Sequence, residues 1–415
     1  MFLNVMVVGM IGISKLYCGT VEPSDALRYG RDSRRLPSHL LQFSFDKKPV
    51  VVWNVTRRCN LRCVHCYSKS TDQTPADELP TAEAVRLIDD LADYGVPVIL
   101  FSGGEPLMRP DIFDLMNHAR ERGQRTVLST NGTLLTIESI ERLREIGLSY
   151  VGISIDGMES THDCFRGVPG AFQRALQAIR SCLSAGLKVG LRFTINRRNA
   201  ADVNAVFDLI ARECIPRICF YHLVYTGRGA SLMSEALSHE ETRRVVDLII
   251  DRTAALHREG FPAEVLTVDN HCDGPYLYMR MLRENSPRAP SVLELLRMNG
   301  GNNSGIGIAC VSWDGTVHPD QFWRHYAVGN VRERPFSEIW SDNSEPLLAR
   351  LRNRRNYIRG RCTQCRWLDV CNCNLRVRAE AVCGDPWGPD PACYLTDAEV
   401  ATETDFKTFE STQAK

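Results

Sequence analysis

Three cysteines, Cys59, Cys63 and Cys66, stand close together directly after a run of β-forming residues. Three thiolates can hold three irons of a 4Fe-4S cubane and leave the fourth iron open, whereas a structural zinc site uses four protein ligands and is closed. An open iron can bind a small chelating molecule. The spacing also allows a zinc knuckle completed by His65 or by a distant residue, so the triplet predicts a metal site of one of these two kinds.

A second motif, Gly103-Gly104-Glu105-Pro106, ends the next predicted strand. Glycines let backbone groups approach a ligand closely, and a carboxylate at this point can pair with a cationic amine. On its own the motif indicates little more than a turn. Its position after a C-x3-C-x2-C triplet makes it a specific indication of a ligand site beside the cysteines.

The C-terminal part of the chain contains a second group of cysteines with another spacing. Its predicted metal ligands are Cys362, Cys365, Cys371 and Cys393. Four thiolates match a closed 4Fe-4S cluster, which transfers electrons and has no iron left for substrate. Zinc remains the alternative, because C-x2-C followed by two further cysteines is also a zinc pattern.

The composition of the 415-residue chain limits its partners. Lysine plus arginine equals aspartate plus glutamate, 50 against 50, so no overall basic field favours nucleic acid, and a small molecule is expected. Nine of the 16 cysteines fall within two short segments, residues 59–66 and 362–393, which favours metal ligation over a disulfide scaffold. No run approaches the roughly 20 apolar residues of a membrane helix, and the apolar start lacks the basic residues of an export signal. We therefore expect a cytoplasmic protein without a membrane partner.

Short β-rich runs alternate with longer amphipathic runs between residues 50 and 260. The predicted strands are Val50–Thr56, Val96–Ser102, Thr126–Thr130, Tyr150–Ile155, Val189–Ile195 and Ile218–Val224. The predicted helices are Thr81–Tyr94, Ile112–Arg122, Ile137–Ile146, Phe172–Ala185, Val203–Glu213 and Glu240–Arg258. This alternation predicts a parallel sheet whose ligand-binding end is formed by the loops after the strands, where the cysteine triplet lies.

Changes in this rhythm divide the chain into five predicted parts. They are an N-terminal extension (1–46), a barrel (47–260), a connector rich in glycine and proline whose loops line the substrate site (261–307), a cysteine-rich module (308–400) and a flexible tail (401–415). In the cysteine-rich module, Asp314 and Gly315 predict a hairpin turn between Ala309–Trp313 and Thr316–Pro319.

The triplet followed by Gly-Gly-Glu-Pro resembles the signature of the radical S-adenosylmethionine superfamily, and the resemblance covers about residues 50–225. It implies an α/β fold, a partial (β/α)6 TIM barrel, in which the open iron of a 4Fe-4S cluster chelates S-adenosylmethionine. Gly103, Gly104 and Glu105 would contact the methionyl amine, Arg192 the methionyl carboxylate, and the backbone of His65 the adenine. Residues at positions that usually contact the ribose or carboxylate are Ser129, Asn131, Ser154 and Asp156.

The C-terminal cysteines resemble the SPASM/twitch-like extension of radical enzymes, an α+β module that in its full form binds two auxiliary clusters. Here Cys310 is the one cysteine kept of the inner set, since Asp320 and Leu375 stand near the positions of others. We therefore predict a single auxiliary 4Fe-4S cluster, two clusters in all. Cys373 and Cys383 are spare thiols near this cluster that could be alternative ligands or buried small side chains, and we interpret them as the latter.

The connector and the second cysteine group together resemble the NirJ-type radical enzymes of haem d1 biosynthesis, over about residues 50–399. The resemblance implies a didecarboxysirohaem-type tetrapyrrole substrate, from which a 5′-deoxyadenosyl radical removes propionate side chains, and an electron donor such as flavodoxin or ferredoxin. An acidic substrate requires basic side chains that bind its carboxylates. The candidate substrate residues are Arg228, Arg297, Arg324, His325 and His271, the last preferred over His222 and His318 as a ligand of the substrate iron. Cys272 is interpreted as incidental.

Other functions remain open at this point. A related haem-pathway radical decarboxylase and a peptide-modifying SPASM enzyme share the same cysteine pattern. A zinc or iron-sulfur binding protein without catalytic activity is the alternative outside enzymes.

Overall fold

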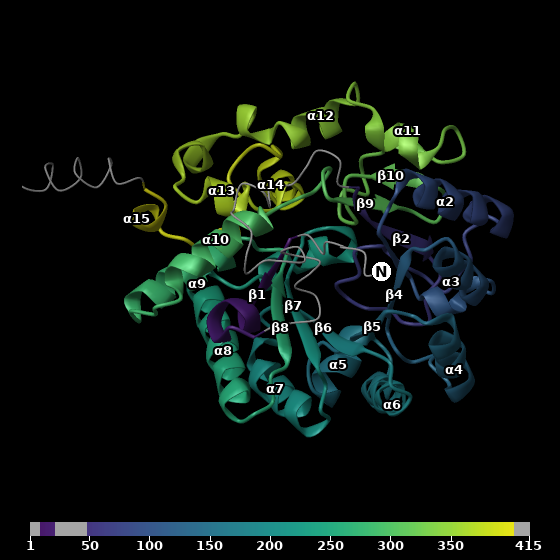
Figure 1. Cartoon of the computed structure of the whole chain (residues 1–415), viewed down its shortest axis with the longest axis horizontal. Helices are drawn as coiled ribbons and strands as arrows, with labels where there is room; N and C mark the ends of the chain where they lie inside the picture. The colour runs from purple at the N-terminus through teal and green to yellow at the C-terminus, as the bar shows by residue number, and fades with distance from the viewer. Residues whose placement is uncertain (1–8, 21–47, 402–415) are drawn as a thin grey trace, which may run out of the picture.

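The computed structural model describes residues 9–20 and 48–401 of the chain (Figure 1). At its centre lies a curved sheet with the strand order β1-β8-β7-β6-β5-β4-β3-β2-β9-β10-β11. The parallel strands are β2 (Val50–Thr56), β3 (Val98–Gly103), β4 (Arg125–Thr130), β5 (Tyr150–Ser154), β6 (Val189–Ile195), β7 (Arg217–His222) and β8 (Glu264–Val268). Because β8 pairs with β1 rather than with β2, the barrel stays open, and the predicted partial barrel is confirmed.

Helices connect successive strands and cover the outer face of the sheet (Figure 1). They are α2 (Thr81–Tyr94), α3 (Ile112–Glu121), α4 (Ile137–Ile146), α5 (Glu159–Arg166), α6 (Ala171–Ser184), α7 (Val203–Arg212) and α8 (His239–Arg258). The sequence-based limits of β2, β6, α2 and α4 agree residue for residue with the structure. Local signals explain this agreement: at the start of α4, Thr136 and Ser139 form a capping box, and Gly147 ends the helix in the left-handed conformation.

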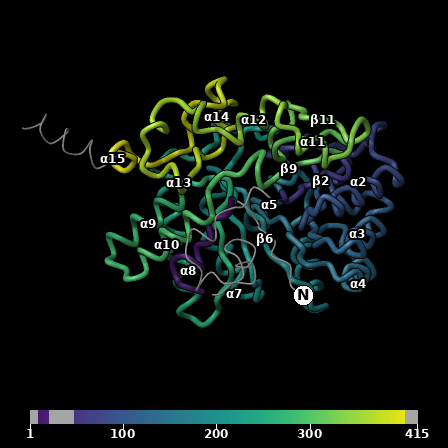
Figure 2. The backbone as a smooth tube through the Cα atoms, turned by 45° about the horizontal axis from the view of Figure 1, so that its top comes forward, coloured from purple at the N-terminus to yellow at the C-terminus, as the bar shows by residue number. Residues whose placement is uncertain are grey.

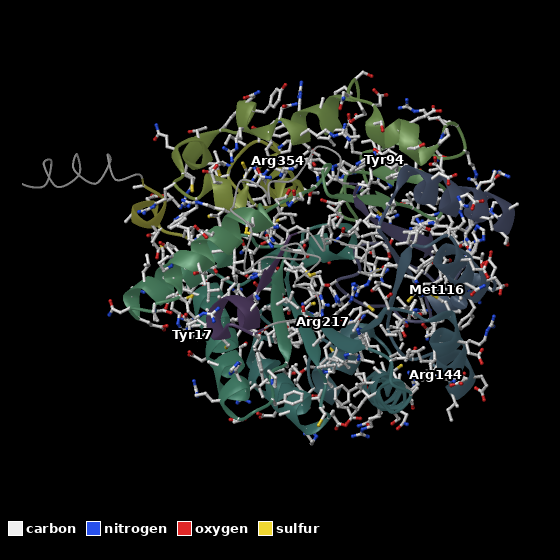
Figure 3. All side chains as sticks on the ribbon, viewed as in Figure 1. Tyr17, Tyr94, Met116, Arg144, Arg217 and Arg354 are labelled. Carbon is white, nitrogen blue, oxygen red and sulfur yellow. The ribbon has the colours of Figure 1, made fainter. Side chains whose placement is uncertain are left out.

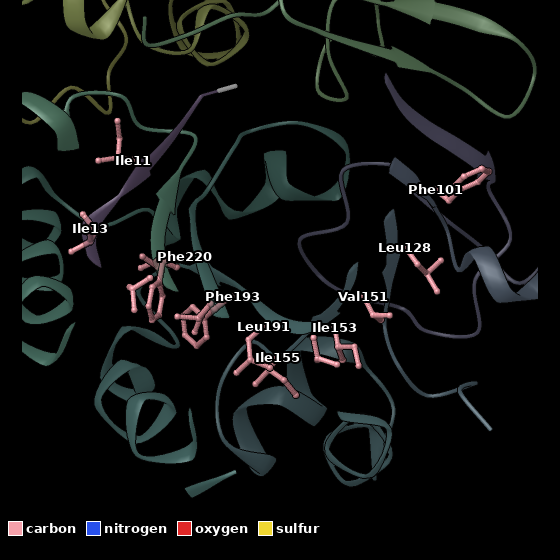
Figure 4. Close-up of a cluster of buried hydrophobic side chains, with 14 of the residues drawn as sticks. Ile11, Ile13, Phe101, Leu128, Val151, Ile153, Ile155, Leu191, Phe193 and Phe220 are labelled. Carbon is pink, nitrogen blue, oxygen red and sulfur yellow. The ribbon is translucent and has the colours of Figure 1, made fainter. Parts of the chain in front are cut away.

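The main core lies between the sheet and these helices (Figure 4). In β6, Leu191 and Phe193 face the helices, where Phe193 packs against Phe220 of β7 with ring centroids 5.6 Å apart. Arg192 and Thr194, at the alternate positions, line the interior cavity instead. The period-two alternation of a strand therefore separates the residues that hold the fold from those that form the site.

Part of the predicted N-terminal extension belongs to the sheet. Residues Met10–Gly12 form β1, which pairs antiparallel with β8, and a π-helix follows at Ser14–Cys18. The rest of the predicted extension, 1–8 and 21–46, lies outside the described residues, as does almost all of the predicted tail, 402–415.

The predicted connector differs from the structure, because it contains β8 and two helices, α9 (Asp273–Arg283) and α10 (Ala289–Asn299), rather than loops alone. The prolines that suggested loops stand in the first turns of these helices: Pro275 in α9 and Pro290 in α10. A proline is tolerated there because its missing N–H would have no helical partner.

The C-terminal module lies along one end of the barrel (Figure 2). Its strands are β9 (Ile308–Val311), β10 (Thr316–His318) and β11 (Gly329–Asn330), and its helices are α11 (Phe336–Ser341), α12 (Pro346–Arg352), α13 (Leu368–Cys371), α14 (Arg376–Cys383) and α15 (Asp397–Val400). β9 and β10 form the predicted hairpin, with Gly315 at φ +84° in the turn. β9 also pairs parallel with β2, so one sheet runs from the barrel into the module.

Side chains hold the module in place as well, and two of them are labelled in Figure 3. Ser341 of α11 donates a hydrogen bond to Tyr94 of α2 at 3.0 Å. Arg354, which is buried, donates to Asn302 Oδ1 at 2.6 Å and to Ser304 O at 2.8 Å. Within residues 9–20 and 48–401, no helix combines the length and the apolar character needed to cross a membrane.

Candidate active site

The cysteine triplet lies in the loop that follows β2, at the carboxyl end of the barrel strands. Cys59 and Cys63 are buried, and burial raises the pKa of the Cys59 thiol to about 12. At Cys66, burial also acts to raise the pKa, but hydrogen bonds from Ser68 and Ser70 lower it below its usual value. Without a metal, therefore, the three thiols do not all tend to ionise. Nearby positive charge is needed to favour their thiolate forms.

Two arginines supply that positive charge. Arg166 at the end of α5 donates a hydrogen bond to Cys63 Sγ at 3.3 Å and forms a buried ion pair with Asp156, Nη2 to Oδ2 2.5 Å. Arg228 donates to the carbonyl oxygens of Cys63 and Ser70, both at 2.8 Å, and so fixes the loop. Three thiols held beside two cations fit the thiolate ligands of an open 4Fe-4S cluster.

The glycines of the second motif bring the loop after β3 against this cysteine loop. A Cβ on Gly104 would lie 2.0 Å from Arg58 O, and one on Gly103, whose φ is +131°, would lie 2.4 Å from Thr56 O. Both glycines also line the cavity described below. Glycine is required at both positions because two backbone segments pack closely there. The absence of a side chain also gives a ligand access to the backbone.

Glu105 is fully buried behind the cavity wall rather than among the residues that line it. Its carboxylate accepts hydrogen bonds from Thr130 Oγ1 and Asn131 N, both at 2.8 Å, and from Leu107 N at 3.2 Å. Burial raises its pKa to about 7 despite these hydrogen bonds. The carboxylate thus holds the loop after β4 in place, and its contact with a methionyl amine stays a prediction.

A cavity of about 190 Å³ opens directly beside the triplet. The predicted cofactor residues that line it are Gly103, Gly104, His65, Ser129, Asn131, Ser154 and Arg192. Arg192 fits because β5 has a glycine beside it: a Cβ on Gly152 would lie 2.3 Å from Arg192 Nε. That Nε is buried and has no hydrogen-bond partner among the described residues, so the guanidinium is available to an anionic ligand.

Asp156 takes another position than the one expected for it. It is fully enclosed outside the cavity lining, paired with Arg166 and 3.4 Å from His65 Nε2. Although burial acts to raise its pKa, Arg166 and His65 hold the pKa of this carboxyl below its usual value. In the structure Asp156 therefore orients Arg166 behind the cysteines, and its contact with the cofactor stays a prediction.

The remaining lining of the cavity consists of aromatic, aliphatic and charged side chains. These lining residues include Tyr67, Leu223, Val224, Phe322, Tyr221, His222, Arg228 and Asp269. Of the predicted substrate residues, Arg228 is therefore at the cavity, although two of its nitrogens already hold the cysteine loop. Its Nη2 is buried without a partner among the described residues.

The other four predicted substrate residues lie outside the cavity lining. Arg297 is exposed on α10, and His325, also exposed, pairs with Glu380 at 2.7 Å. Arg324 packs against the ring of Trp313, 4.5 Å from its centroid. His271, the preferred histidine, is enclosed beside Asn374, with its pKa lowered to about 4 by burial. Arg297 and His325 are exposed, whereas contacts with residues distant in the sequence enclose His271. The local sequence around these residues indicates neither outcome.

His222 is the histidine that the structure brings to the cavity. Its Nε2 lies 2.9 Å from Asp273 Oδ2, and the other oxygen of Asp273 accepts a hydrogen bond from Tyr394 at 2.7 Å. Asp273 follows Cys272, and Tyr394 follows Cys393. This hydrogen-bonded chain joins the first cavity to the second cysteine group. No sequence motif predicts this connection.

A second, smaller cavity of about 20 Å³ contains the predicted auxiliary site. Cys362, Cys365, Cys371 and Cys393 all line it, together with Cys272 and Cys373. The structure thus corrects one interpretation, because Cys272 lies at the site and is not incidental to it, whereas Cys373 is buried near the site as expected. Cys272 lowers the pKa of Cys393 to about 7 by donating a hydrogen bond to it. Cys310 and Cys383 are not among the lining residues. Cys383 is exposed, so its interpretation as a buried small side chain is wrong.

Six thiols around one cavity exceed the four that a closed cluster needs. Burial raises the pKa of most of them, to about 12 for Cys362, so free thiols would stay protonated there. A cluster that takes four of them as thiolates removes this cost. The donor set, made of sulfur alone, suits an iron-sulfur cluster.

Comparisons with known proteins agree with this geometry. Residues 53–210 match the model of the radical SAM superfamily, and residues 304–366 match an iron-sulfur cluster-binding domain, SPASM. The chain is 66% identical to Fe-coproporphyrin III synthase of Methanosarcina barkeri over 94% of this chain and 99% of that protein. It is 45% identical to pre-heme d1 synthase of Dinoroseobacter shibae over 86% and 89% of the two chains.

Among solved structures, SuiB of Streptococcus suis bound to S-adenosylmethionine shares the fold, with a TM-score of 0.67. The identity is 18%, and the match covers 84% of this chain and 78% of that one. The matched families supply the cofactors: S-adenosylmethionine and two 4Fe-4S clusters, one at the triplet and one in the SPASM domain. With the cavity, the triplet and these relatives in agreement, the chain belongs to the radical SAM superfamily as an enzyme with a C-terminal SPASM domain.

Proposed function

We propose that this enzyme removes side chains from an iron tetrapyrrole, converting a didecarboxysirohaem-type substrate to Fe-coproporphyrin III. The observation that carries the proposal is the identity of 66% to a protein named Fe-coproporphyrin III synthase, over nearly the whole of both chains. An identity of this size along the full length includes the connector and the C-terminal module, which form one wall of the cavity through Asp269 and Phe322.

The composition of the cavity supports the same substrate class. Tyr67 and Phe322 pack edge to face at 5.7 Å and line the cavity together with Leu223, so a conjugated macrocycle can contact aromatic and aliphatic side chains there. Arg192 and Arg228 each keep a nitrogen without a partner among the described residues, and carboxylate side chains of the substrate can accept hydrogen bonds from both.

The chemistry divides between cofactor and protein. When bound, S-adenosylmethionine and its cluster supply a 5′-deoxyadenosyl radical that takes a hydrogen atom from the substrate. The protein holds the cluster through Cys59, Cys63 and Cys66, fixes their loop through Arg228, and orients the macrocycle against the apolar wall. Relative to didecarboxysirohaem, Fe-coproporphyrin III lacks the acetate groups of the reduced rings and carries ring double bonds in their place.

The removal of propionates on the route to haem d1, expected from the sequence, is the second candidate. The relative named pre-heme d1 synthase, at 45% identity, favours it. Relatives named AdoMet-dependent heme synthase, at 35% identity in Methanosarcina barkeri, support a related haem-pathway reaction. A peptide-modifying activity has the weakest support, from relatives such as PqqA peptide cyclase at 28% identity.

One experiment separates these candidates. The anaerobic holoenzyme is incubated with S-adenosylmethionine, a reductant and didecarboxysirohaem, and the tetrapyrrole is analysed by mass spectrometry. Loss of acetate mass with formation of Fe-coproporphyrin III supports the proposal, and loss of propionate mass supports the haem d1 route instead. Formation of 5′-deoxyadenosine without any change in the tetrapyrrole contradicts both.

The proposal extends to location and to the electron donor. We infer a cytoplasmic enzyme, because thiolate-held iron-sulfur clusters suit a reducing compartment. Its reductant is a small one-electron carrier of the flavodoxin or ferredoxin class. Iron and acid-labile sulfide analysis of the purified protein provides the first check, with about eight irons per chain expected for two 4Fe-4S clusters.

A further inference from the structure

Asp269, directly after β8, has a backbone conformation that a non-glycine residue rarely adopts, with φ at +65°. The C-terminal module holds it there. Arg378 of α14 donates a hydrogen bond to Asp269 O at 2.9 Å, and Arg378 is itself fixed by Asp390 through two hydrogen bonds of 2.8 Å. Both members of this ion pair are almost fully buried.

The next two residues are held in the same way. Asn270 donates to Ala392 O at 2.9 Å and accepts a hydrogen bond from Asn374 at 2.6 Å. The backbone N–H of His271 donates to Asn374 Oδ1 at 2.8 Å. Successive residues of one short segment are thus fixed by a module far away in the sequence, and strained conformations fixed from outside in this manner are concentrated at functional sites.

Asp269 lines the cavity. Within residues 9–20 and 48–401, its carboxyl takes part in no hydrogen bond, although Arg378 binds its backbone carbonyl. Burial raises the pKa of Asp269 to about 7, against the lowering effect of Arg378 on α14 and Arg192 on β6. Asp320, after β10, raises it further, and the charge of Asp269 in turn raises the pKa of Tyr221 on β7.

The reaction under Proposed function, on which this inference rests, needs a proton at this place. After a hydrogen atom leaves the ring carbon beside the acetate-bearing carbon, the bond from that carbon to the acetate methylene breaks homolytically. One electron of the broken bond completes the ring double bond, and the other stays on a carboxymethyl radical. This fragment becomes acetate only by gaining one electron, from the flavodoxin- or ferredoxin-class reductant, and one proton.

We propose that Asp269 is the catalytic acid that delivers this proton to the methylene carbon of the departing side chain. Asp269 lies at the cavity, the C-terminal module holds its backbone in place, and the absence of a carboxyl partner among the described residues leaves the proton free to transfer. Solvent returns the proton to Asp269 after each cycle.

Two substitutions test the proposal without disturbing the fold, since asparagine and glycine both tolerate the left-handed conformation. In Asp269→Asn, the amide cannot supply the proton, so acetate release at pH 7 should fall about a hundredfold or more, while 5′-deoxyadenosine still forms. In Asp269→Gly, release should fall likewise, and the thermal midpoint should rise because strain is removed. Asp114→Asn, at a side chain that is 77% exposed, is the matched control.

The pH dependence and isotope content give readouts that a structural role would not change. Acetate release by the unsubstituted enzyme should decrease as the pH rises through about 7, because the acid loses its proton, and this decrease should vanish in Asp269→Asn. In deuterium oxide the released acetate should carry deuterium in its methyl group. Tetrapyrrole affinity, measured by optical titration without S-adenosylmethionine, should stay unchanged in Asp269→Asn.

Three different outcomes would contradict the proposal, and each leads to a different conclusion. If the unsubstituted enzyme releases acetate and Asp269→Asn releases it at the same rate with the same pH profile, the acid is another group. If Asp269→Asn loses tetrapyrrole affinity but keeps the pH profile, Asp269 binds substrate and is not the acid. If the unsubstituted enzyme releases no acetate from didecarboxysirohaem, the proposed function itself fails and the acid role fails with it.

Discussion

His222 and Asp273 are hydrogen-bonded at 2.9 Å, and this contact connects the lining of the first cavity to the segment that contributes Cys272 to the second cavity. Asp273 is fully buried. Its pKa, which burial alone would raise, is held below the usual value by His222. A substitution at this position therefore affects both cavities at once.

Replacing Asp273 by Ala should leave the imidazole of His222 and the hydroxyl of Tyr394 without their shared acceptor. Removing one partner of a buried charged hydrogen bond costs about 3–5 kcal/mol, so a loss of this order in the free energy of unfolding is expected from anaerobic denaturant titration. Arg144→Ala, which breaks an exposed pair with Glu141, should leave the free energy of unfolding almost unchanged. Equal losses in the two variants would contradict the structural role of Asp273.

Replacing Cys59, Cys63 and Cys66 together by Ala should abolish 5′-deoxyadenosine formation, because these thiols are the predicted ligands of the cluster that binds S-adenosylmethionine. Iron should fall to about four per chain, the content of the auxiliary cluster alone. Liquid chromatography of the nucleoside product and iron analysis provide the measurements. A variant that kept both clusters would show that the triplet is not the ligand set.

The second cysteine group should respond differently. Cys371→Ala should keep the cleavage of S-adenosylmethionine but impair turnover of the tetrapyrrole, since the first cluster stays intact. Cys272→Ser should keep both clusters, because four other predicted ligands remain around the cavity. Electron paramagnetic resonance of the reduced protein distinguishes the two cases, with the exposed Cys383→Ser as control. Loss of the auxiliary signal in Cys272→Ser would make Cys272 a ligand.

Gly104→Ala should destabilise the cysteine loop, because the added Cβ would lie 2.0 Å from Arg58 O, a backbone atom that has no room to move. Overpacking of this kind costs about 1–3 kcal/mol or more, and iron bound at the triplet should decrease with it. At Gly388 the nearest atom to an added Cβ is Asp385 O at 3.5 Å, so Gly388→Ala is the matched control. A normal iron content in Gly104→Ala would show that the loop has more freedom than the structure indicates.

Glu105 should make stability depend on pH. Its folded-state pKa is raised by burial from 4.5 to about 7, so the folded protein binds this proton more tightly than the unfolded chain. The stabilisation is complete below about pH 4.5 and is lost as the pH rises through 7, by a few kcal/mol. Urea titrations of the holoenzyme at pH 5 and pH 8 should show a difference that is smaller in Glu105→Gln. An unchanged difference would mean that Glu105 is ionised at both pH values.

The sequence contained enough local information to predict the barrel and the two cysteine groups. Capping residues such as Thr136 and the alternation in Val189–Ile195 act over a few residues, and the corresponding elements were predicted with their correct limits. The prolines at 275 and 290 misled because they permit a first helical turn as readily as a loop.

Long-range contacts explain what could not be predicted. Arg166 reaches Cys63 from the end of α5, and Asp269 is fixed by Arg378 from α14. No sequence motif joins these residues. Nothing in the sequence around them indicates that the fold brings them to the cavity. His271 shows the converse, since its surroundings in the sequence suggest exposure and the structure buries it.

The pairing of β9 with β2 also has a consequence for how the enzyme is made in the cell. During synthesis, β2 and the cysteine loop behind it leave the ribosome long before β9 exists, and parallel pairing between such distant segments forms late in folding. The edge of β2 that pairs with β9 therefore stays unpaired until the C-terminal module has been synthesised. We expect iron-sulfur carriers to deliver both clusters after the chain is complete, so nascent chains stalled before residue 308 should contain no cluster that survives purification.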